Sequence, residues 1–196
     1  MGWLNLADWL PCTEVEGPGK RFALWVQGCH LRCPGCCNPG MFAFIPRRLV
    51  ATNLLLARIL EAAEREGIEG VTMLGGEPLL QARGLAEVAQ GCQAHGLSVI
   101  VFTGYTLEEL EEASLPGVPE LLASTDLLID GRYLASAPEG RRNWVGSTNQ
   151  RFHYLTDRYA PSIETDARFS AGIELRFQRD GTLGIHGAPR LISPRD

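Results

Sequence analysis

The sequence lacks the features that mark membrane-spanning and secreted proteins. None of its apolar runs approaches the roughly 20 residues that a helix needs to cross a bilayer. Its N-terminus has no basic start followed by an apolar segment, so we find no signal peptide. These absences predict a cytoplasmic protein with no membrane partner, in a compartment where thiols stay reduced.

Positive charge is also scarce. The 196 residues carry 18 Lys and Arg against 23 Asp and Glu, for a formal net charge of −5. A nucleic-acid-binding domain usually shows a strongly basic face, so we expect no nucleic acid partner. Low-complexity stretches and solenoid-length repeats are absent as well. The length then fits one ordinary domain that is large enough for a hydrophobic core.

The chain does contain four short apolar runs, each followed by a loop with glycine. They are rich in β-branched and aromatic residues and are apolar on both faces, as buried parallel strands are. Because the carboxyl ends of parallel strands meet at one edge of the sheet, we expect the four loops to share one site. The runs are "RFALWV" at 21–26, "GVTML" at 70–74, "LSVIVF" at 97–102 and "DLLI" at 126–129.

Helical patterns lie between these runs. Residues 52–66 and 82–95 repeat their apolar positions at helical spacing, and each pattern is followed by a glycine that is typical of a helix end. Residues 106–109, Thr-Leu-Glu-Glu, form a capping box that predicts the start of a short helix. Alternating strands and helices predict an α/β fold whose parallel sheet is either open or bent into a barrel.

The C-terminal segment has a different pattern. Two alternating runs flank Arg-Asp-Gly-Thr at 179–182, which predicts a β-hairpin over 173–187. Pro189 and Pro194 predict the end of ordered structure. We therefore divide the chain into a domain at 1–170 and a hairpin and tail at 171–196, packed on that same domain.

Cysteine is concentrated in one loop, where four of the six cysteines fall within nine residues. Three of them, Cys29, Cys33 and Cys36, have the spacing Cys-x3-Cys-x2-Cys. Three thiolates on a short loop can hold three corners of an iron–sulfur cube and leave one iron open to another ligand. Gly28 and Gly35 would let backbone N–H groups approach the sulfur atoms.

Other uses of these thiols are a structural zinc site, a disulfide framework, or catalytic or buried cysteines. A structural zinc commonly takes two separated ligand pairs, and a second pair is missing. Cys37 adjoins Cys36, and we expect its side chain to point elsewhere. A reducing compartment and a chain of this length argue against a disulfide framework. We expect Cys12 and Cys92 to be small core residues.

Five motifs in order resemble those of radical S-adenosylmethionine (SAM) enzymes. The cysteine segment "EGPGKRFALWVQGCHLRCPGCCNPG" is followed by "GGEPL" at 75–79, "FTGYTLEEL" at 102–110, "DLLIDGRY" at 126–133 and "GSTNQR" at 146–151. The set is most similar to the activating enzyme of the anaerobic (class III) ribonucleotide reductase and its relatives, the glycyl radical enzyme activases. The resemblance covers roughly residues 14–155 and excludes the C-terminal hairpin.

The resemblance implies a fold and a metal site. The fold would be a single-domain incomplete parallel (β/α) barrel of radical SAM type, followed by the C-terminal hairpin. Cys29, Cys33 and Cys36 would bind a [4Fe-4S] cluster. SAM would chelate the open iron through its amino and carboxylate groups.

The resemblance also implies a SAM pocket at the loops that follow the next three strands. The Gly-Gly-Glu-Pro turn would meet the methionine amino group with carbonyl and carboxylate acceptors, and its second glycine would leave room for the ligand. The loops after the third and fourth strands would line the same pocket near the ribose and methionine. The implied residues are Gly75, Gly76, Glu77, Pro78, Thr103, Gly104, Tyr105 and Asp130.

The implied activity is that of a radical SAM oxidoreductase. It would cleave SAM reductively to methionine and a 5′-deoxyadenosyl radical, with no side chain as acid or base. The implied partners are a glycyl radical enzyme, whose backbone glycine would lose a hydrogen atom, and an electron donor such as flavodoxin or ferredoxin. Two other hypotheses stay open, a radical SAM enzyme that modifies a small molecule or peptide and a non-catalytic metal-binding module.

Overall fold

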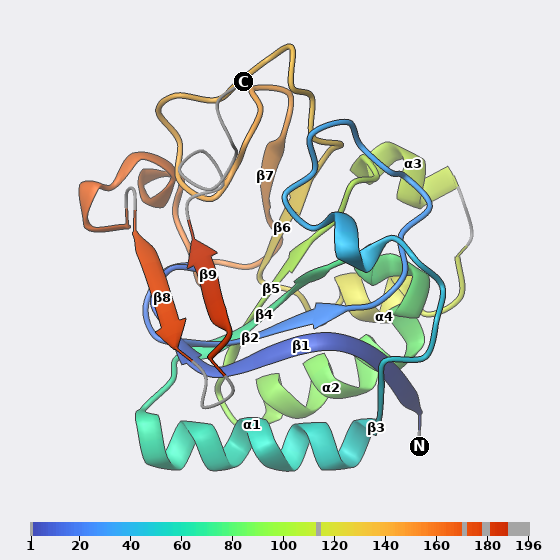
Figure 1. Cartoon of the computed structure of the whole chain (residues 1–196). Helices are drawn as coiled ribbons and strands as arrows, with labels where there is room; N and C mark the ends of the chain where they lie inside the picture. The colour runs from blue at the N-terminus through green and yellow to red at the C-terminus, as the bar shows by residue number, and fades with distance from the viewer. Residues whose placement is uncertain (1, 113–114, 170–171, 178–180, 188–196) are drawn as a thin grey trace.

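The computed structural model describes residues 2–112, 115–169, 172–177 and 181–187. Its centre is a seven-stranded sheet with the order β3-β1-β2-β4-β5-β6-β7 (Figure 1). The strands of this sheet are β1 (Trp3–Thr13), β2 (Arg21–Val26), β3 (Arg48–Ala51), β4 (Gly70–Gly75), β5 (Ser98–Phe102), β6 (Leu127–Asp130) and β7 (Arg151–Tyr154).

The four predicted runs form the parallel part of the sheet. β2, β4, β5 and β6 are neighbours in this order, and each pairs in parallel with the next. The prediction of an α/β fold with a parallel sheet is therefore confirmed. The sheet is open, with β3 and β7 as its outer strands, so the structure does not show a closed barrel.

Three antiparallel strands at the margins were not predicted. β1 pairs with both β2 and β3, and β7 pairs with β6. β1 interrupts its apolar alternation with Asp8 and Pro11, and the residues of β7 are only half-buried. Marginal strands are defined by distant pairing partners more than by their own composition, so local patterns miss them.

The helices follow the predicted boundaries closely. α1 (Thr52–Glu66) has the predicted bounds, and α2 (Ala82–Ala94) is one residue shorter than predicted. Two shorter helices, α3 (Leu107–Glu112) and α4 (Val118–Leu122), follow. None of the helices in the described ranges is long and apolar enough to cross a membrane.

Two of the predicted signals for helix termini, Gly67 and the capping box at 106–109, are present. Gly67 ends α1 in the left-handed conformation, with φ of 68°. At the start of α3, the Thr106 N–H donates to the Glu109 carboxylate at 2.8 Å, and the Glu109 N–H donates to the Thr106 hydroxyl at 3.2 Å. This reciprocal pair is the predicted capping box.

The two faces of the sheet have different neighbours. Phe22, Leu24 and Val26 of β2 join the core that packs against α1 and α2, whereas Ala23 and Trp25 belong to a separate cluster on the opposite face. In Figure 1 the helices α1 and α2 lie below the sheet, and the loops after the strands rise on its other side. The face opposite the helices is therefore the one available for a ligand site.

One buried arginine forms hydrogen bonds that join the amino-terminal ends of the parallel strands. Arg21 is fully buried at the start of β2. Its guanidinium donates to the Thr72 hydroxyl at 2.6 Å, to the Tyr159 hydroxyl at 2.8 Å and to both the hydroxyl and the carbonyl of Ser98. These bonds connect β2, β4 and β5 to the segment after β7 at the end of the sheet far from the cysteine loop.

The predicted C-terminal hairpin is present as a separate two-stranded sheet. β8 (Ile173–Phe177) pairs antiparallel with β9 (Leu183–Gly187). Arg179 and Asp180 of the predicted turn, and Pro189 and Pro194 of the tail, lie outside the described residues. The hairpin stands beside the start of β2 in Figure 1, on the side of the sheet away from α1.

Candidate functional site

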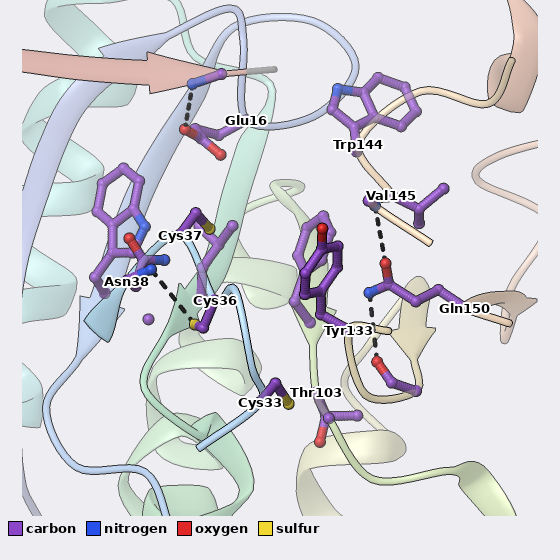
Figure 2. Close-up of a pocket in the computed structure, with 18 of the residues that line it drawn as sticks. Glu16, Cys33, Cys36, Cys37, Asn38, Thr103, Tyr133, Trp144, Val145 and Gln150 are labelled. Atoms are coloured by element: carbon purple, nitrogen blue, oxygen red, sulfur yellow. Dashed lines mark hydrogen bonds between the residues drawn. The ribbon is translucent and has the colours of Figure 1, made fainter. Parts of the chain in front are cut away.

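The loops that follow the parallel strands surround one cavity of about 480 Å³. This volume lies within the usual range of small-molecule and cofactor sites. Figure 2 shows Cys33, Cys36, Tyr133 and Thr103 around the same space. Of the residues that the sequence indicated, those that line the cavity are Cys29, Cys33, Cys36, Gly75, Gly76, Glu77, Pro78, Thr103 and Gly104.

The cysteine loop is held in place by its own backbone and by the segment after it. Gly28 and Arg32 both adopt positive φ, of 101° and 47°. The Gly28 N–H donates to the Met41 carbonyl at 2.9 Å, and the Cys29 N–H donates to the Phe42 carbonyl at 3.2 Å. These backbone hydrogen bonds position the start of the loop.

Two of the thiols already receive hydrogen bonds. Burial raises the pKa of Cys29, and backbone N–H groups of Arg32 and Leu31 oppose this shift. The neighbouring thiol of Cys37 holds the pKa of Cys36 at about 6, and the Asn38 N–H adds a donor 3.4 Å from the Cys36 sulfur. The Cys37 thiol is near enough to act on Cys36, and Cys37 also lines the cavity.

The chemistry of the donor set suits an iron–sulfur cluster. Cys29, Cys33 and Cys36 line the cavity from one loop, and the Asn38 N–H donates to the Cys36 sulfur. Thiolates with backbone N–H donors at their sulfur atoms are usual ligands of such clusters. Within the described ranges, no three His, Cys, Asp or Glu side chains form a group that could hold one metal ion.

The Gly-Gly-Glu-Pro turn packs directly against the cysteine loop. The Glu77 N–H donates to the Gly28 carbonyl at 2.9 Å, and the Gly76 N–H donates to the Val26 carbonyl at 2.8 Å. A Cβ atom at Gly76 would lie 2.3 Å from the Gly28 oxygen. Glycine is thus required at 76 because the cysteine loop is so near, where the sequence suggested only that a ligand needs the space.

The Glu77 carboxylate joins two loops and is almost fully buried. One oxygen accepts hydrogen bonds from the Thr103 hydroxyl at 2.8 Å and the Leu79 N–H at 3.0 Å, and the other accepts from the Gly104 N–H at 2.9 Å. The sequence had assigned this carboxylate to a ligand amino group. In the structure its hydrogen bonds hold the Thr103–Gly104 turn against the short turn Pro78–Gln81 that precedes α2.

Asp130 and Tyr105 are not among the residues that line the cavity. Asp130 is fully buried, and its carboxylate accepts hydrogen bonds from the Leu107 N–H at 2.7 Å and from Arg151 at 2.6 and 3.1 Å. Burial opposes its ionisation, but Arg151, Leu107 and His153 together lower the pKa of Asp130. The hydrogen bond from the Leu107 N–H makes Asp130 an anchor for the start of α3.

The Tyr105 hydroxyl lies 3.1 Å from the His30 ring nitrogen.

The cavity also has aromatic walls that the sequence did not indicate. Trp144, with φ of 60°, lies 5.5 Å from Phe169 between ring centroids, and Trp25 lies 5.2 Å from His186. All four line the cavity, together with Tyr133. The "GSTNQR" and "DGRY" segments mark the neighbourhoods of Trp144 and Tyr133, but no motif covers Phe169 or His186. Phe169 and His186 can be identified only from the structure, where they contact Trp144 and Trp25.

The buried carboxyl of Glu77 predicts a pH-dependent stability. Burial raises the pKa of Glu77 to about 7, against an ordinary value near 4.5. The folded state therefore holds this proton more tightly than the unfolded state, and its contribution to the free energy of unfolding falls as pH rises from about 4.5 to 7. We expect the wild type to lose stability relative to Glu77→Gln across this range, measured by denaturant unfolding of the reduced protein.

For Glu139 we expect the opposite pH dependence of the free energy of unfolding. It is buried, but the Arg141 N–H and the Arg142 guanidinium lower the pKa of Glu139 to about 2. The wild type should therefore lose stability relative to Glu139→Gln as pH falls from about 4.5 to 2. Equal pH profiles for the wild type and Glu77→Gln between pH 4.5 and 7 would contradict the prediction for Glu77.

Comparison with known proteins assigns the family. A family model described as a 4Fe-4S single cluster domain matches residues 15–153, which include the cysteine loop and the turns around the cavity. The anaerobic ribonucleoside-triphosphate reductase-activating protein of Pasteurella multocida is 33% identical over 78% of this chain and 99% of its own.

The proteins of the same name from phage T4 and Escherichia coli K12 are 30% and 28% identical, over 75% and 78% of this chain. In these two comparisons the relatives are matched over 92% and 99% of their own lengths. The chain belongs to the single-cluster 4Fe-4S domain family and, within it, to the anaerobic ribonucleoside-triphosphate reductase-activating proteins.

Proposed function

We propose that this chain is a radical SAM activase that installs a glycyl radical on an anaerobic ribonucleoside-triphosphate reductase. The observation that carries the proposal is the single cavity that the cysteine loop, the Gly-Gly-Glu-Pro turn and the Thr103 turn all line. The relatives named above are activating proteins of that reductase. The open sheet, with its site at the carboxyl ends of parallel strands, is in keeping with an incomplete barrel of radical SAM type.

We assign Cys29, Cys33 and Cys36 as the ligands of a [4Fe-4S] cluster. The lowered pKa of Cys36 supports this role, because a thiolate is the form that binds iron. We assign SAM to the remaining space of the cavity. The backbone of Gly75 and Gly76 would receive its methionine amino group, and Thr103 and Gly104 would lie along the ligand.

The cluster held by Cys29, Cys33 and Cys36 would, with bound SAM and one electron from a donor protein, supply the radical chemistry for hydrogen-atom abstraction. The chain's own residues hold the ligands and exclude water from the cavity. The aromatic walls formed by Trp25, Trp144 and Tyr133 serve this exclusion, since a reactive radical requires a dry site. Glu77 and Asp130 act as positioning residues, because their carboxylates fix the turns that carry Thr103 and Leu107.

We further propose that the protein works in the cytoplasm and receives electrons from a flavodoxin or ferredoxin. All six cysteines are unbridged in the structure, in keeping with a reducing compartment. The exposed side of the cysteine loop, where Cys37 and Arg32 lie, is where such a donor would approach.

A second candidate is a radical SAM enzyme that acts on a small molecule or peptide. The observation that favours it is the hairpin, whose Ile185, His186 and Gly187 line the cavity on one side. A wall of this kind would suit a small ligand that is enclosed within the cavity. The two candidates differ in what is consumed together with SAM.

The test is anaerobic reconstitution, reduction and addition of SAM, with and without the anaerobic ribonucleoside-triphosphate reductase encoded in the same genome. We expect 5′-deoxyadenosine and a carbon-centred EPR doublet on the reductase. The doublet should vanish when the radical-site glycine of the reductase is changed to alanine. SAM cleavage without any reductase radical, or with stoichiometric loss of a small molecule, would favour the second candidate.

A further inference from the structure

The β8–β9 hairpin carries its apolar side chains on its more exposed face. Leu175 is 53% exposed, Phe177 is 81% exposed and Leu183 is 48% exposed. Phe177 pairs across the strands with Leu183, and Leu175 pairs with Ile185, so these four side chains share one continuous face. Ile173, on the same face of β8, is 41% exposed. We call these five residues the outer hairpin face.

The opposite face of the hairpin is polar and binds the domain. The Thr13 hydroxyl donates to the Glu174 carboxylate, and the Arg176 guanidinium donates to the Cys12 carbonyl. The Gly187 N–H donates to the Glu16 carboxylate at 2.9 Å, a bond drawn in Figure 2. The usual arrangement of a surface hairpin, apolar inward and polar outward, is thus reversed.

A contiguous apolar face on an exposed two-stranded sheet is unfavourable in water. Apolar side chains scattered singly on a surface are normal, but a connected patch marks a place where another surface binds. Among the described residues, none covers the outer hairpin face.

The position of the outer hairpin face indicates what binds there. Ile185 belongs both to this face and to the lining of the cavity, and His186 and Gly187 line the cavity beside it. The face is therefore continuous with the mouth of the candidate site. A protein that inserts a segment into the cavity has to lie over this mouth, and the adjoining apolar surface meets it there.

The hairpin also lies outside the part of the chain that the family shares. The match to the single-cluster domain ends at residue 153, twenty residues before β8 begins at Ile173. The chemistry common to the family is contained in the matched part. An additional element at the mouth of the site is suited to selecting or orienting a particular protein substrate.

We propose that the outer hairpin face is the docking surface for the protein that this chain activates. The inference rests on the proposed function, because it assumes that the substrate is a protein with a segment that enters the cavity. The partner would present an apolar surface next to that segment, and binding would bury the side chains of Leu175, Phe177 and Leu183. The hairpin would contribute to affinity for the partner and not to SAM cleavage.

The experiment compares the wild type with Leu175→Ser/Phe177→Ser. The partner is the anaerobic ribonucleoside-triphosphate reductase of the same genome. We expect the reductase concentration for half-maximal radical formation to rise on the order of tenfold or more, since truncation of central apolar residues has effects of this size. The maximal rate, SAM cleavage without reductase and the thermal midpoint should stay at wild-type values. Direct binding of the metal-free proteins, measured by biolayer interferometry, should weaken in parallel.

The control is Leu49→Ser/Leu54→Ser, which removes two leucines of 61% and 59% exposure from β3 and α1. Neither residue lines the cavity, so this variant should bind the reductase like the wild type. Phe177→Ser alone serves as a second test variant. Its ring is 81% exposed, so we expect its loss to leave the thermal midpoint of the protein unchanged, which circular dichroism checks.

Three results would overturn the proposal. If both hairpin variants need the same reductase concentration as the wild type for half-maximal radical formation and bind the reductase equally well, the face does not contact the partner. A change in oligomeric state by sedimentation, with unchanged reductase dependence, would assign the face to a second copy of this chain. A wild type that cleaves SAM but neither binds nor activates the reductase would remove the proposed function and the docking surface together. If the wild type activates the reductase and both hairpin variants activate it equally well, the docking surface is removed and the proposed function stands.

Discussion

Anaerobic reconstitution of Cys29→Ala, Cys33→Ala or Cys36→Ala should yield protein that has lost most of its iron and its iron–sulfur absorbance. Each of these thiols lines the cavity from the same loop, and each would be the sole protein ligand of one iron. For Cys29, the hydrogen bonds from the Gly28 and Cys29 N–H groups to the Met41 and Phe42 carbonyls fix the backbone, so another thiol cannot take its place without moving the loop. The measurements are iron and sulfide content and the visible spectrum after desalting.

The matched controls are the other three cysteines. Cys12→Ala and Cys92→Ala remove thiols that do not line the cavity, and both should keep full cluster content. Cys37→Ala is the more demanding control, because the Cys37 thiol lies beside Cys36. It should also retain the cluster, since the Asn38 N–H still donates to the Cys36 sulfur. Full iron content in Cys33→Ala, or loss in Cys37→Ala, would show that the ligands are wrongly assigned.

Gly76→Ala should lose both the cluster and SAM binding. The resemblance implied that the glycine at 76 leaves room for SAM, so that a side chain there would block the ligand alone. In the structure the added Cβ would instead lie 2.3 Å from the carbonyl oxygen of Gly28, which is backbone and cannot yield as a flexible side chain would. The cysteine loop would have to shift, and Cys29 would shift with it.

Gly40→Ala is the control for this substitution. Gly40 lies in the segment that follows the cysteines, but a Cβ atom there would meet no other atom within 4 Å. Iron content and the SAM-dependent change in the EPR spectrum of the reduced protein should match the wild type in this control. An intact cluster with lost SAM response in Gly76→Ala would restore the sequence-based explanation.

The parallel core could be predicted because its signal is local. Short, mainly apolar runs of four to six residues defined β2, β4, β5 and β6 closely, and helical spacing with a following glycine defined α1 to the residue. The meeting of the loops at one edge then followed from the topology of parallel sheets. The antiparallel strand β1 was missed, because its place in the sheet depends on pairing with β2 and β3.

The roles of individual acids could not be predicted in the same way. Glu77 and Asp130 each follow a strand, and the motifs place both near the cavity. Whether such a carboxylate faces a ligand or its own protein depends on a donor far along the chain. For Glu77 that donor is the Thr103 hydroxyl, and for Asp130 it is Arg151. The sequence located the right loops and left their internal hydrogen bonds undetermined.

The buried arginine at the start of β2 bears on how a protein of this kind can diversify. β2 is six residues long, with Arg21 at one end and the cysteine loop directly after the other. The bonds that hold the strands together at the Arg21 end involve no residue of the cavity lining. Substitutions around the cavity can therefore accumulate, and alter what is bound, without weakening this anchor.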